Sequence, residues 1–149
     1  MLLKNVIFTP HLKELSRLTK KSVDFIQNNI YNPICLCDEI KCIDKECGSN
    51  VVVIKDAITM TLNNECIYMN TSGNNGLATG GSGDVLSGII AGLSATSTEN
   101  IKAASLGAFV HGLCADEYVK DYNPYSLNAT DIINYIEKVI GGISNEEVL

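Results

Sequence analysis

Residues 70–92 read NTSGNNGLATGGSGDVLSGIIAG, and this stretch decides what kind of domain the chain can form. It holds seven glycines, Asp84 is its only charged residue, and its glycine-rich part leads directly into an apolar pattern of helical spacing. The pattern predicts a helix from Ser82 to about Ser94 that follows a tight glycine turn. Because a helix N-terminus offers unpaired N–H groups and a partial positive charge, GGSGD at 80–84 is a candidate phosphate cradle.

Asp84 adds a chemical group to this cradle. It stands in the first turn of the expected helix, where the helix dipole stabilises an ionised carboxylate. Such a carboxylate can accept the proton of a substrate hydroxyl while that hydroxyl attacks a transferable phosphoryl group. A glycine-rich helix start with an aspartate also occurs as plain capping, and the motif is neither a Walker A loop nor a dinucleotide fingerprint. The motif by itself therefore leaves a catalytic and a structural interpretation open.

The rest of the chain alternates strand and helix patterns. NVIF at 5–8 predicts a short strand, and VVVIK at 51–55 is a β-branched run typical of a buried parallel strand. AITMTL and ECIYMN flank Asn63-Asn64 and predict a β-hairpin whose turn tolerates positive φ. We expect the strands at 5–8 and 51–55 to be parallel neighbours, joined by a right-handed connection through two helices.

Four further helices are expected. The first has Thr9 as its N-cap and Pro10 at its first position, and it runs to Asn28-Asn29. The second spans about 33–45. The third begins near Thr96 with Glu99 as its capping-box partner, and the fourth begins near Asn128 and stops at Gly141-Gly142. His111 falls within the third helix, where we interpret it as a hydrogen-bonded structural histidine.

Composition narrows the function classes. The chain has 149 residues, enough for one domain with a real core, and 46% of them are hydrophobic. Its net charge is −6 without any basic cluster, so neither nucleic acid nor an anionic membrane is an expected partner. The longest apolar run, 85–93, is too short to span a bilayer, and the N-terminus lacks a secretory signal pattern. These features indicate a cytoplasmic location.

The six cysteines do not form a recognisable metal motif. Four of them lie within 35–47 as C-x-C-x4-C-x4-C, whereas zinc sites usually pair their ligands as C-x2-C. We interpret these cysteines as small hydrophobic residues in a reducing compartment and assign no metal ligand in the chain. The six are Cys35, Cys37, Cys42, Cys47, Cys66 and Cys114.

The glycine motif and three further segments of the sequence resemble those of a known protein family. NTSGNNGLATGGSGDVLSGIIAGL closely resembles the signature near the C-terminus of the NAD(P)H-hydrate dehydratases, a family of the ribokinase-like superfamily. FTPHLKELSRL, VVVIKDAIT and AASLGAFVHGLCAD resemble further family segments in the same order. The resemblance covers residues 8 to about 136. It implies an α/β fold, namely a truncated three-layer α/β/α domain with parallel strands, a hairpin and a helix-rich C-terminal half.

The family resemblance also implies an activity. Members use ADP or ATP, with Mg²⁺, to phosphorylate the hydroxyl of hydrated NADH or NADPH, and elimination of phosphate then restores the cofactor. Carried over by position, Asp84 is the catalytic base and contacts the hydrated cofactor, which His11 also faces. The residues implied in nucleotide binding are Lys55, Asp56, Ala57, Ile58 and Thr59 on one segment and Gly80, Gly81, Ser82 and Gly83 on the other.

Three departures from the family pattern affect these expectations. Lys55-Asp56 stands where the family has Lys-Gly, and a carboxylate there repels a phosphate unless it turns away or binds a cation. Leu12-Lys13 replaces Pro-Gly after the T-P-H element. Family members also carry roughly a hundred or more residues before that element, so the chain corresponds to the C-terminal half of a domain. We expect residues 1–142 to form this partial domain and 143–149 a loose tail.

A half domain leaves several functional alternatives open. The chain is an active enzyme whose site is completed by a second copy or a separate N-terminal half, an inactive remnant that keeps the nucleotide cradle, or a non-catalytic nucleotide-binding or interaction module. Another ribokinase-like kinase for a carbohydrate or vitamin precursor is the closest enzymatic rival. We expect an oligomer or a paired half, because the strand at 51–55 has no charge before its last residue to protect it as an edge strand and the helix 82–94 is apolar on nearly all sides.

Overall fold

The computed structural model describes residues 5–29, 32, 50–96 and 99–145, and within them the chain forms a four-stranded mixed sheet. Strands β1 and β2 are parallel, with Ile7 opposite Val51, which confirms the predicted pairing. The hairpin of β3 and β4 is also confirmed, and β3 runs antiparallel to β2. The strands stand side by side in the order β1 (Ile7–Phe8), β2 (Val51–Ile54), β3 (Met60–Leu62) and β4 (Ile67–Met69).

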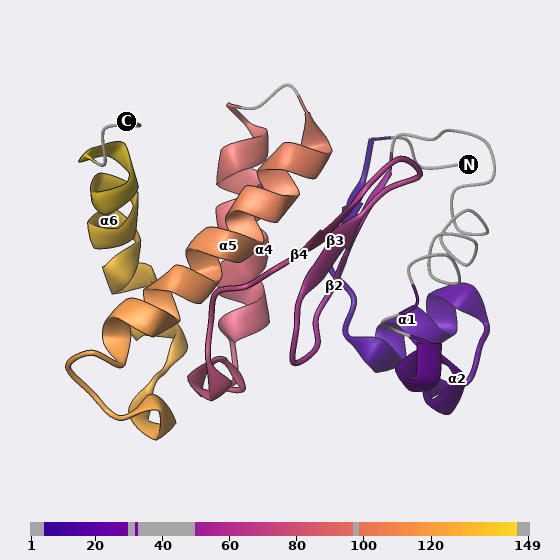
Figure 1. The fold of residues 1–149 in the computed structure, drawn as a ribbon, viewed down its shortest axis with the longest axis horizontal. Coiled ribbons are helices and arrows are strands. Elements are labelled where there is room, and N and C mark those ends of the chain that lie inside the picture. Colours follow the sequence, from indigo (N-terminus) through magenta and orange to yellow (C-terminus); the bar gives the residue numbers. More distant parts are fainter. Residues whose placement is uncertain (1–4, 30–31, 33–49, 97–98, 146–149) are drawn as a thin grey trace.

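Helices cover both faces of this sheet, as Figure 1 shows. Successive side chains of β2 point to opposite faces: Val52 and Ile54 pack with Leu15 and Ile26 on one side. Val51 and Val53 pack with Leu86, Ile90, Ala104 and Ala108 on the other, which completes the expected α/β/α layers. The helices are α1 (Leu12–Thr19) and α2 (Val23–Asn29) on the first face, α4 (Ser82–Ser94) and α5 (Asn100–Tyr118) on the second, and α6 (Ala129–Asn145) packed on α5.

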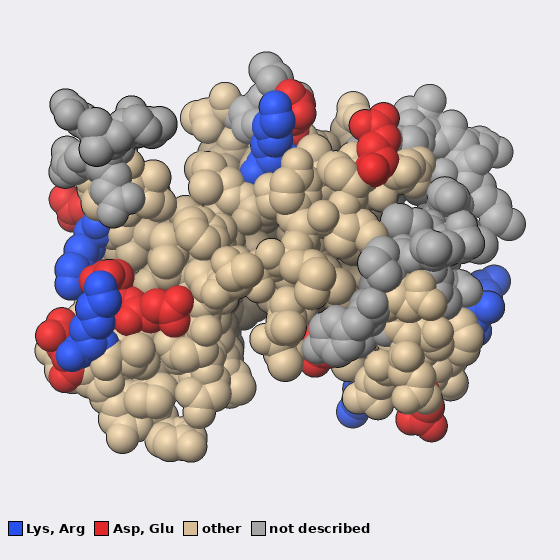
Figure 2. Space-filling model, viewed as in Figure 1, with Lys and Arg blue, Asp and Glu red and all other residues tan. Residues whose placement is uncertain are grey.

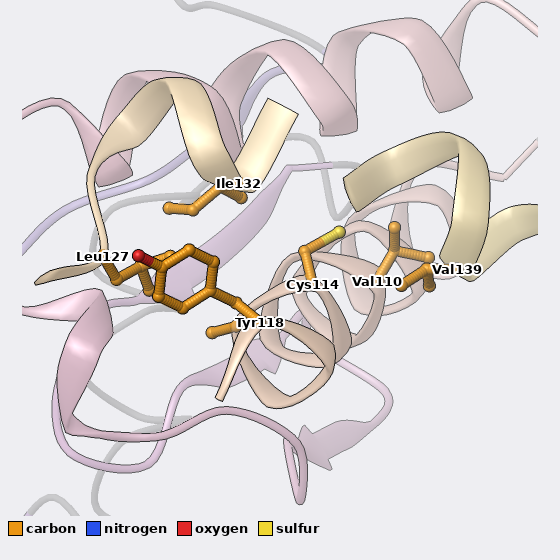
Figure 3. Close-up of a cluster of buried hydrophobic side chains, with 7 residues drawn as sticks. Val110, Cys114, Tyr118, Leu127, Ile132 and Val139 are labelled. Atoms are coloured by element: carbon orange, nitrogen blue, oxygen red, sulfur yellow. The ribbon is translucent and has the colours of Figure 1, made fainter. Parts of the chain in front are cut away.

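Helices α5 and α6 enclose a second core away from the sheet, drawn in Figure 3. Cys114 is fully buried there, and burial raises the pKa of its thiol to about 11. A thiol held in its neutral form behaves as a small hydrophobe, which is the role expected for the cysteines. Cys66 is half-buried, and the other four cysteines lie outside the described residues.

The single helix expected from Thr9 to Asn29 is wrong, because the chain breaks it in two. Lys20 adopts a left-handed conformation with φ 59° and ends α1, and the Ser22 hydroxyl then accepts from the amide of Phe25 at the start of α2. The expected Thr9 cap is wrong as well, since His11 caps α1. Thr9 instead shares a 3.2 Å hydrogen bond between its hydroxyl and that of Ser87 in α4.

Other predicted element ends also differ. The hairpin turn does not use positive φ, because Asn63 Oδ1 accepts from the amides of Glu65 and Cys66 instead. The Thr96–Glu99 capping box is wrong, since α5 begins at Asn100 and the Thr96 hydroxyl donates to Leu93 O. The stop at Gly141-Gly142 is wrong too, because α6 continues to Asn145. The helix expected over 33–45 lies outside the described residues.

The start of α6 follows the expectation. Asn128 Oδ1 accepts from the amides of Thr130 and Asp131, and Asp131 Oδ2 accepts from the Asn128 amide in return. This reciprocal pair satisfies backbone donors that a helix start leaves unpaired, so it fixes where α6 leaves the preceding turn.

Two surface features bear on partners. The expectation of β2 as an unprotected edge strand is wrong, because β1 and β3 pair with it on both sides, and the two-residue β1 forms that edge of the sheet. On the face in Figure 2, acidic and basic side chains lie interspersed mainly around the rim.

No helix in the described ranges is both long and apolar enough to cross a bilayer.

Candidate functional site

The glycine turn presents the N-terminus of α4 as the sequence indicates. Gly81 has φ 84°, which favours glycine, and it caps the helix without any side-chain hydrogen bond. Its carbonyl accepts from the amides of Asp84 and Val85, both at 3.1 Å. The Gly83 N–H has no protein acceptor among the residues that the structure describes, so it is available to a ligand anion.

Lys55 reaches this turn from the sheet. It directly follows β2, and its amide donates to Pro10 O at 2.9 Å, which ties the end of β2 to the segment after β1. A Cβ placed on Gly83 would lie 3.2 Å from the Lys55 ammonium nitrogen. The ammonium group therefore lies directly beside the N-terminus of α4, and the two together form a cationic corner for a phosphate.

Two pockets meet at this corner, because Lys55 and Gly83 line both of them. The first, called the Asp84 pocket, measures about 710 Å³ and is also lined by Gly81 and Asp84. The second, called the Thr59 pocket, measures about 590 Å³. Of the sequence-predicted residues it gathers His11, Lys55, Asp56, Ala57, Thr59, Ser82 and Gly83.

The site thus collects most of the expected residues but divides them. Asp84 lies on one side of the corner, and the segment from Lys55 to Thr59 lies on the other. Ile58 and Gly80 line neither pocket. Two adjoining cavities that share Lys55 and Gly83, one of which also holds the Asp84 carboxylate, form an arrangement suited to transfer of a phosphoryl group between two ligands.

His11 lies in the Thr59 pocket and not in the Asp84 pocket, so the structure does not bring it together with Asp84. Its Nδ1 accepts from the amides of Lys13 and Glu14, and its own amide donates to Glu14 Oε2 at 2.8 Å. That backbone hydrogen bond from His11 is the main cause of the lowered pKa of Glu14. His11 therefore acts as a helix cap here, which is the simpler interpretation of this residue, and its contact with a cofactor stays a prediction.

Sequence reasoning missed the loop that walls the Thr59 pocket. Asn70, Ser72 and Asn74 line it, and α5 holds the loop in place. Ser72 Oγ donates to Phe109 O at 2.8 Å, and Asp116 accepts from the Gly73 amide at 2.7 Å and from Asn74 Nδ2 at 3.0 Å. The polar run at 70–75 within the glycine-rich stretch was the available signal, but its partner Asp116 is remote in sequence.

The Asp84 pocket also holds polar residues beyond those expected. Its charged groups are Glu14, Arg17, Lys55 and Asp84, so both signs face the cavity. Ser87 donates to Gly83 O at 2.9 Å and shares a hydrogen bond with Thr9, which anchors the first turn of α4 to the end of β1. The helical spacing of Glu14 and Arg17 placed them away from the apolar stripe, but nothing in that spacing indicated a pocket.

Replacing Gly112 by alanine is expected to loosen this loop. A Cβ at Gly112 would lie 2.2 Å from Ser72 Oγ and 2.6 Å from Ser72 C, so α5 and the loop must separate. We expect a loss of about 1–3 kcal/mol in the free energy of unfolding, measured by urea denaturation. Gly141→Ala, where a Cβ meets nothing within 4 Å, is the control and should leave stability unchanged or slightly raised. A Gly112→Ala protein as stable as wild type would contradict the close approach.

The fold and the geometry of the site together indicate which class of protein domain this is. A three-layer α/β domain in which a glycine-rich helix N-terminus and a lysine form a cationic corner between two pockets is typical of the ribokinase-like fold. The family model of the NAD(P)H-hydrate dehydratases matches residues 2–138. The chain belongs to this family.

Individual relatives of similar sequence belong to the same family. The chain is 39% identical over 113 residues to the ADP-dependent (S)-NAD(P)H-hydrate dehydratase of Neisseria meningitidis, covering 76% of this chain and 36% of that protein. It is 34% identical over 142 residues to the bifunctional NAD(P)H-hydrate repair enzyme Nnr of Thermofilum pendens, covering 94% of this chain and 26% of the relative. The chain therefore spans about a quarter to a third of these relatives.

Solved structures show the same relation. The ADP/ATP-dependent NAD(P)H-hydrate dehydratase of Bacillus subtilis, co-crystallised with ATP and Mg²⁺, superposes with a TM-score of 0.79 at 27% identity. The match covers 91% of this chain and 47% of that one. A Streptococcus mutans protein gives the same TM-score at 28% identity, again over 47% of its length. The fold expected from the sequence is confirmed.

Proposed function

We propose that this chain provides the nucleotide site and the catalytic base of an enzyme that repairs hydrated NADH and NADPH. The observation that carries the proposal is the cationic corner of Lys55 and Gly83, which stands between the pocket of Asp84 and the pocket of Thr59. A phosphoryl group held at this corner is open to a donor on one side and to an acceptor on the other. The family membership supplies the identity of donor and acceptor.

The nucleotide fits the Thr59 pocket. Its terminal phosphates meet the free Gly83 amide and the Lys55 ammonium, while Asp56, Ala57 and Thr59 line the adjoining space. Gly81 and Ser82 complete the turn that surrounds the anion, and Gly80 and Ile58 flank these segments in sequence. ADP or ATP is the donor, by the names of the relatives, and the Mg²⁺ that accompanies it binds through the phosphates.

Asp56 is the acidic residue of the Thr59 pocket, so a nucleotide phosphate meets a carboxylate as well as an ammonium group. A divalent cation bound between carboxylate and phosphate turns this repulsion into attraction, because Mg²⁺ prefers oxygen ligands of both kinds. Nucleotide binding by this chain should therefore depend more strongly on Mg²⁺ than Lys55 alone would require.

The hydrated cofactor occupies the Asp84 pocket. Asp84 accepts the proton of the hydrate hydroxyl, whose oxygen forms a bond to the terminal phosphorus as the bond from that phosphorus to the nucleotide oxygen breaks. The nucleotide leaves one phosphate shorter, and Lys55 stabilises the negative charge that develops on it. Phosphate then leaves the carbon with the bonding electrons, a proton leaves the adjacent carbon, and the double bond of the nicotinamide ring is restored.

A cytoplasmic location stays a prediction from the sequence.

A panel of acceptors tests this function against its rivals. ATP consumption is measured with hydrated NADH, with a sugar and with a vitamin-precursor alcohol, after a thermal-shift titration has established ADP or ATP binding. We expect consumption with hydrated NADH only. Consumption with another alcohol would identify a different kinase, nucleotide binding without any consumption would identify an inactive remnant, and no stabilisation by nucleotide would indicate an interaction module.

The assembly of the active form is part of the proposal. An apolar groove of about 640 Å³ lies between α4, α5 and α6, and Asp84 stands in its lining together with Ile89 and Leu93. Strand β1 stands at one edge of the sheet, and no strand in the part of the chain that the structure describes pairs with its outer side. The remaining lining residues on α5 and α6 are Leu106, Val110, Ile133, Ile136, Ile140 and Ile143.

Because this groove exposes apolar surface, we expect the chain to associate with a second copy or with a polypeptide that supplies the N-terminal half of the domain. The interface should bury more than about 1,000 Å². Light scattering at low micromolar concentration should give more than the mass of one chain, or should do so once the complementary half is added. A stable monomer that associates neither with a second copy nor with the complementary half would contradict this expectation.

A further inference from the structure

His111 is a buried histidine of α5 that the reaction described above does not use. Its Nε2 lies 3.0 Å from the carbonyl oxygen of Ser82 and 3.2 Å from the Ser82 hydroxyl oxygen. Ser82 is the first residue of α4, and both residues line the Thr59 pocket. One ring nitrogen thus faces two oxygen atoms of a residue in the anion-binding turn.

The two oxygens decide which tautomer fits. A carbonyl oxygen can only accept, so an unprotonated Nε2 would place its lone pair against that of Ser82 O at 3.0 Å. Nε2 must therefore carry the hydrogen and donate to Ser82. With Nε2 as the donor, the Ser82 hydroxyl cannot donate to it, and the hydroxyl hydrogen is left to point elsewhere.

The Ser82 hydroxyl has an open direction on the pocket side. Ser82 is buried and lines the Thr59 pocket, and among the described residues its hydroxyl has no hydrogen-bond partner besides His111, so a ligand in that pocket can accept its hydrogen. We propose that His111 is a positioning residue: its Nε2–H fixes the Ser82 carbonyl and leaves the Ser82 hydroxyl to donate to a nucleotide phosphate. This inference rests on the proposed function, because the phosphate comes from that proposal.

The electrostatic surroundings agree with a neutral donor. Burial lowers the pKa of His111, against the opposing effect of its hydrogen bond to Ser82. The other titratable groups that line the Thr59 pocket are His11, Lys55 and Asp56. Because Lys55 already supplies a positive charge there, His111 needs to contribute a directed hydrogen bond and not a second charge.

Affinity for ADP and for adenosine separates positioning from general structure, since adenosine lacks the phosphates. Calorimetric titration of His111→Leu should show ADP bound about tenfold more weakly, the scale of one hydrogen bond to a charged group, with adenosine binding nearly unchanged. Ser82→Ala should give a similar loss, and the double variant no more than either single change, because the two residues act as a unit. His111→Gln, which keeps a donor, should restore most of the ADP affinity.

Cys114→Ala is the matched control, since Cys114 is also buried on the same helix and lines no site pocket. It should lower stability without changing ADP affinity. Equal loss of ADP and adenosine binding in His111→Leu, wild-type affinity in that variant, or effects that multiply in the double variant would each overturn the proposal.

A direct measurement covers the case in which His111→Leu does not fold. Nitrogen-15 NMR of the wild-type imidazoles reports the tautomer, and the proposal requires Nε2–H at His111 both with and without ADP. An Nδ1–H tautomer would overturn it regardless of the variants. A wild-type protein that binds no ADP would instead overturn the proposed function, and this inference with it.

Discussion

Replacing Asp84 by asparagine should abolish phosphoryl transfer while leaving the nucleotide bound. The substitution keeps the shape of the side chain and the helix N-terminus but removes the group that accepts the hydroxyl proton, which is worth about 10²–10⁴-fold in rate. Because the Lys55–Gly83 corner is unchanged, ADP affinity should stay within about tenfold of wild type. Turnover with hydrated NADH and calorimetric ADP binding measure the two effects separately.

The contrast between rate and affinity is what identifies a base. Near-normal turnover in Asp84→Asn would remove Asp84 from the mechanism. A parallel loss of rate and ADP binding would instead assign Asp84 to the structure of the turn. Asp131→Asn at the start of α6 is a suitable control, since it makes the same chemical change in a helix cap that lines neither site pocket.

Gly83→Val should act on binding and not on the transfer step, because it should prevent the nucleotide from binding. A Cβ at this position lies 3.2 Å from the Lys55 ammonium nitrogen and 3.8 Å from its Cδ, and the two methyl groups of valine extend further into the corner. Lys55 must move away, and the free Gly83 amide becomes screened from an anion. We expect ADP affinity to fall by at least about a hundredfold, the scale of two charge-assisted hydrogen bonds.

Gly88→Val controls for the cost of a β-branched residue in the same helix. A Cβ at Gly88 meets nothing within 4 Å, and the residue lines the apolar groove between α4, α5 and α6 and not the Thr59 pocket. Gly88→Val should therefore keep its ADP affinity, whatever it does to association. If both variants bound ADP as wild type does, the corner would not be the phosphate site.

The sequence predicts well those features that depend on local backbone chemistry. The glycine turn before α4, the helix that starts at Ser82 with Asp84 in its first turn, and the helix start near Asn128 with Asp131 in its first turn are all as expected. The strand at β2 and the β3–β4 hairpin followed from runs of strand-forming residues with turn residues between them. Each of these signals lies within a few neighbouring residues.

Features that a continuous apolar pattern conceals, or that depend on distant contacts, were not predictable. The apparent stripe through Leu12 and Ile26 reads as one helix, and only the left-handed Lys20 and the Ser22 cap reveal two. The placement of His11 in the Thr59 pocket goes with a parallel bridge between His11 and Lys55, which are 44 residues apart in the sequence. The hydrogen bond between His111 and Ser82 joins two different helices. The sequence therefore correctly predicted a hydrogen-bonded histidine but could not identify its partner.

The recovery of reduced nicotinamide from hydrated NADH tests the central claim most directly. The chain, in its associated form and supplied with ATP and Mg²⁺, should release inorganic phosphate and restore NADH in equal amounts, whereas Asp84→Asn should do neither. Equal yields follow because one phosphoryl group is transferred and eliminated for each cofactor repaired. Restoration of NADH without phosphate release, or an assembly that binds ATP and yields neither product, would contradict the account.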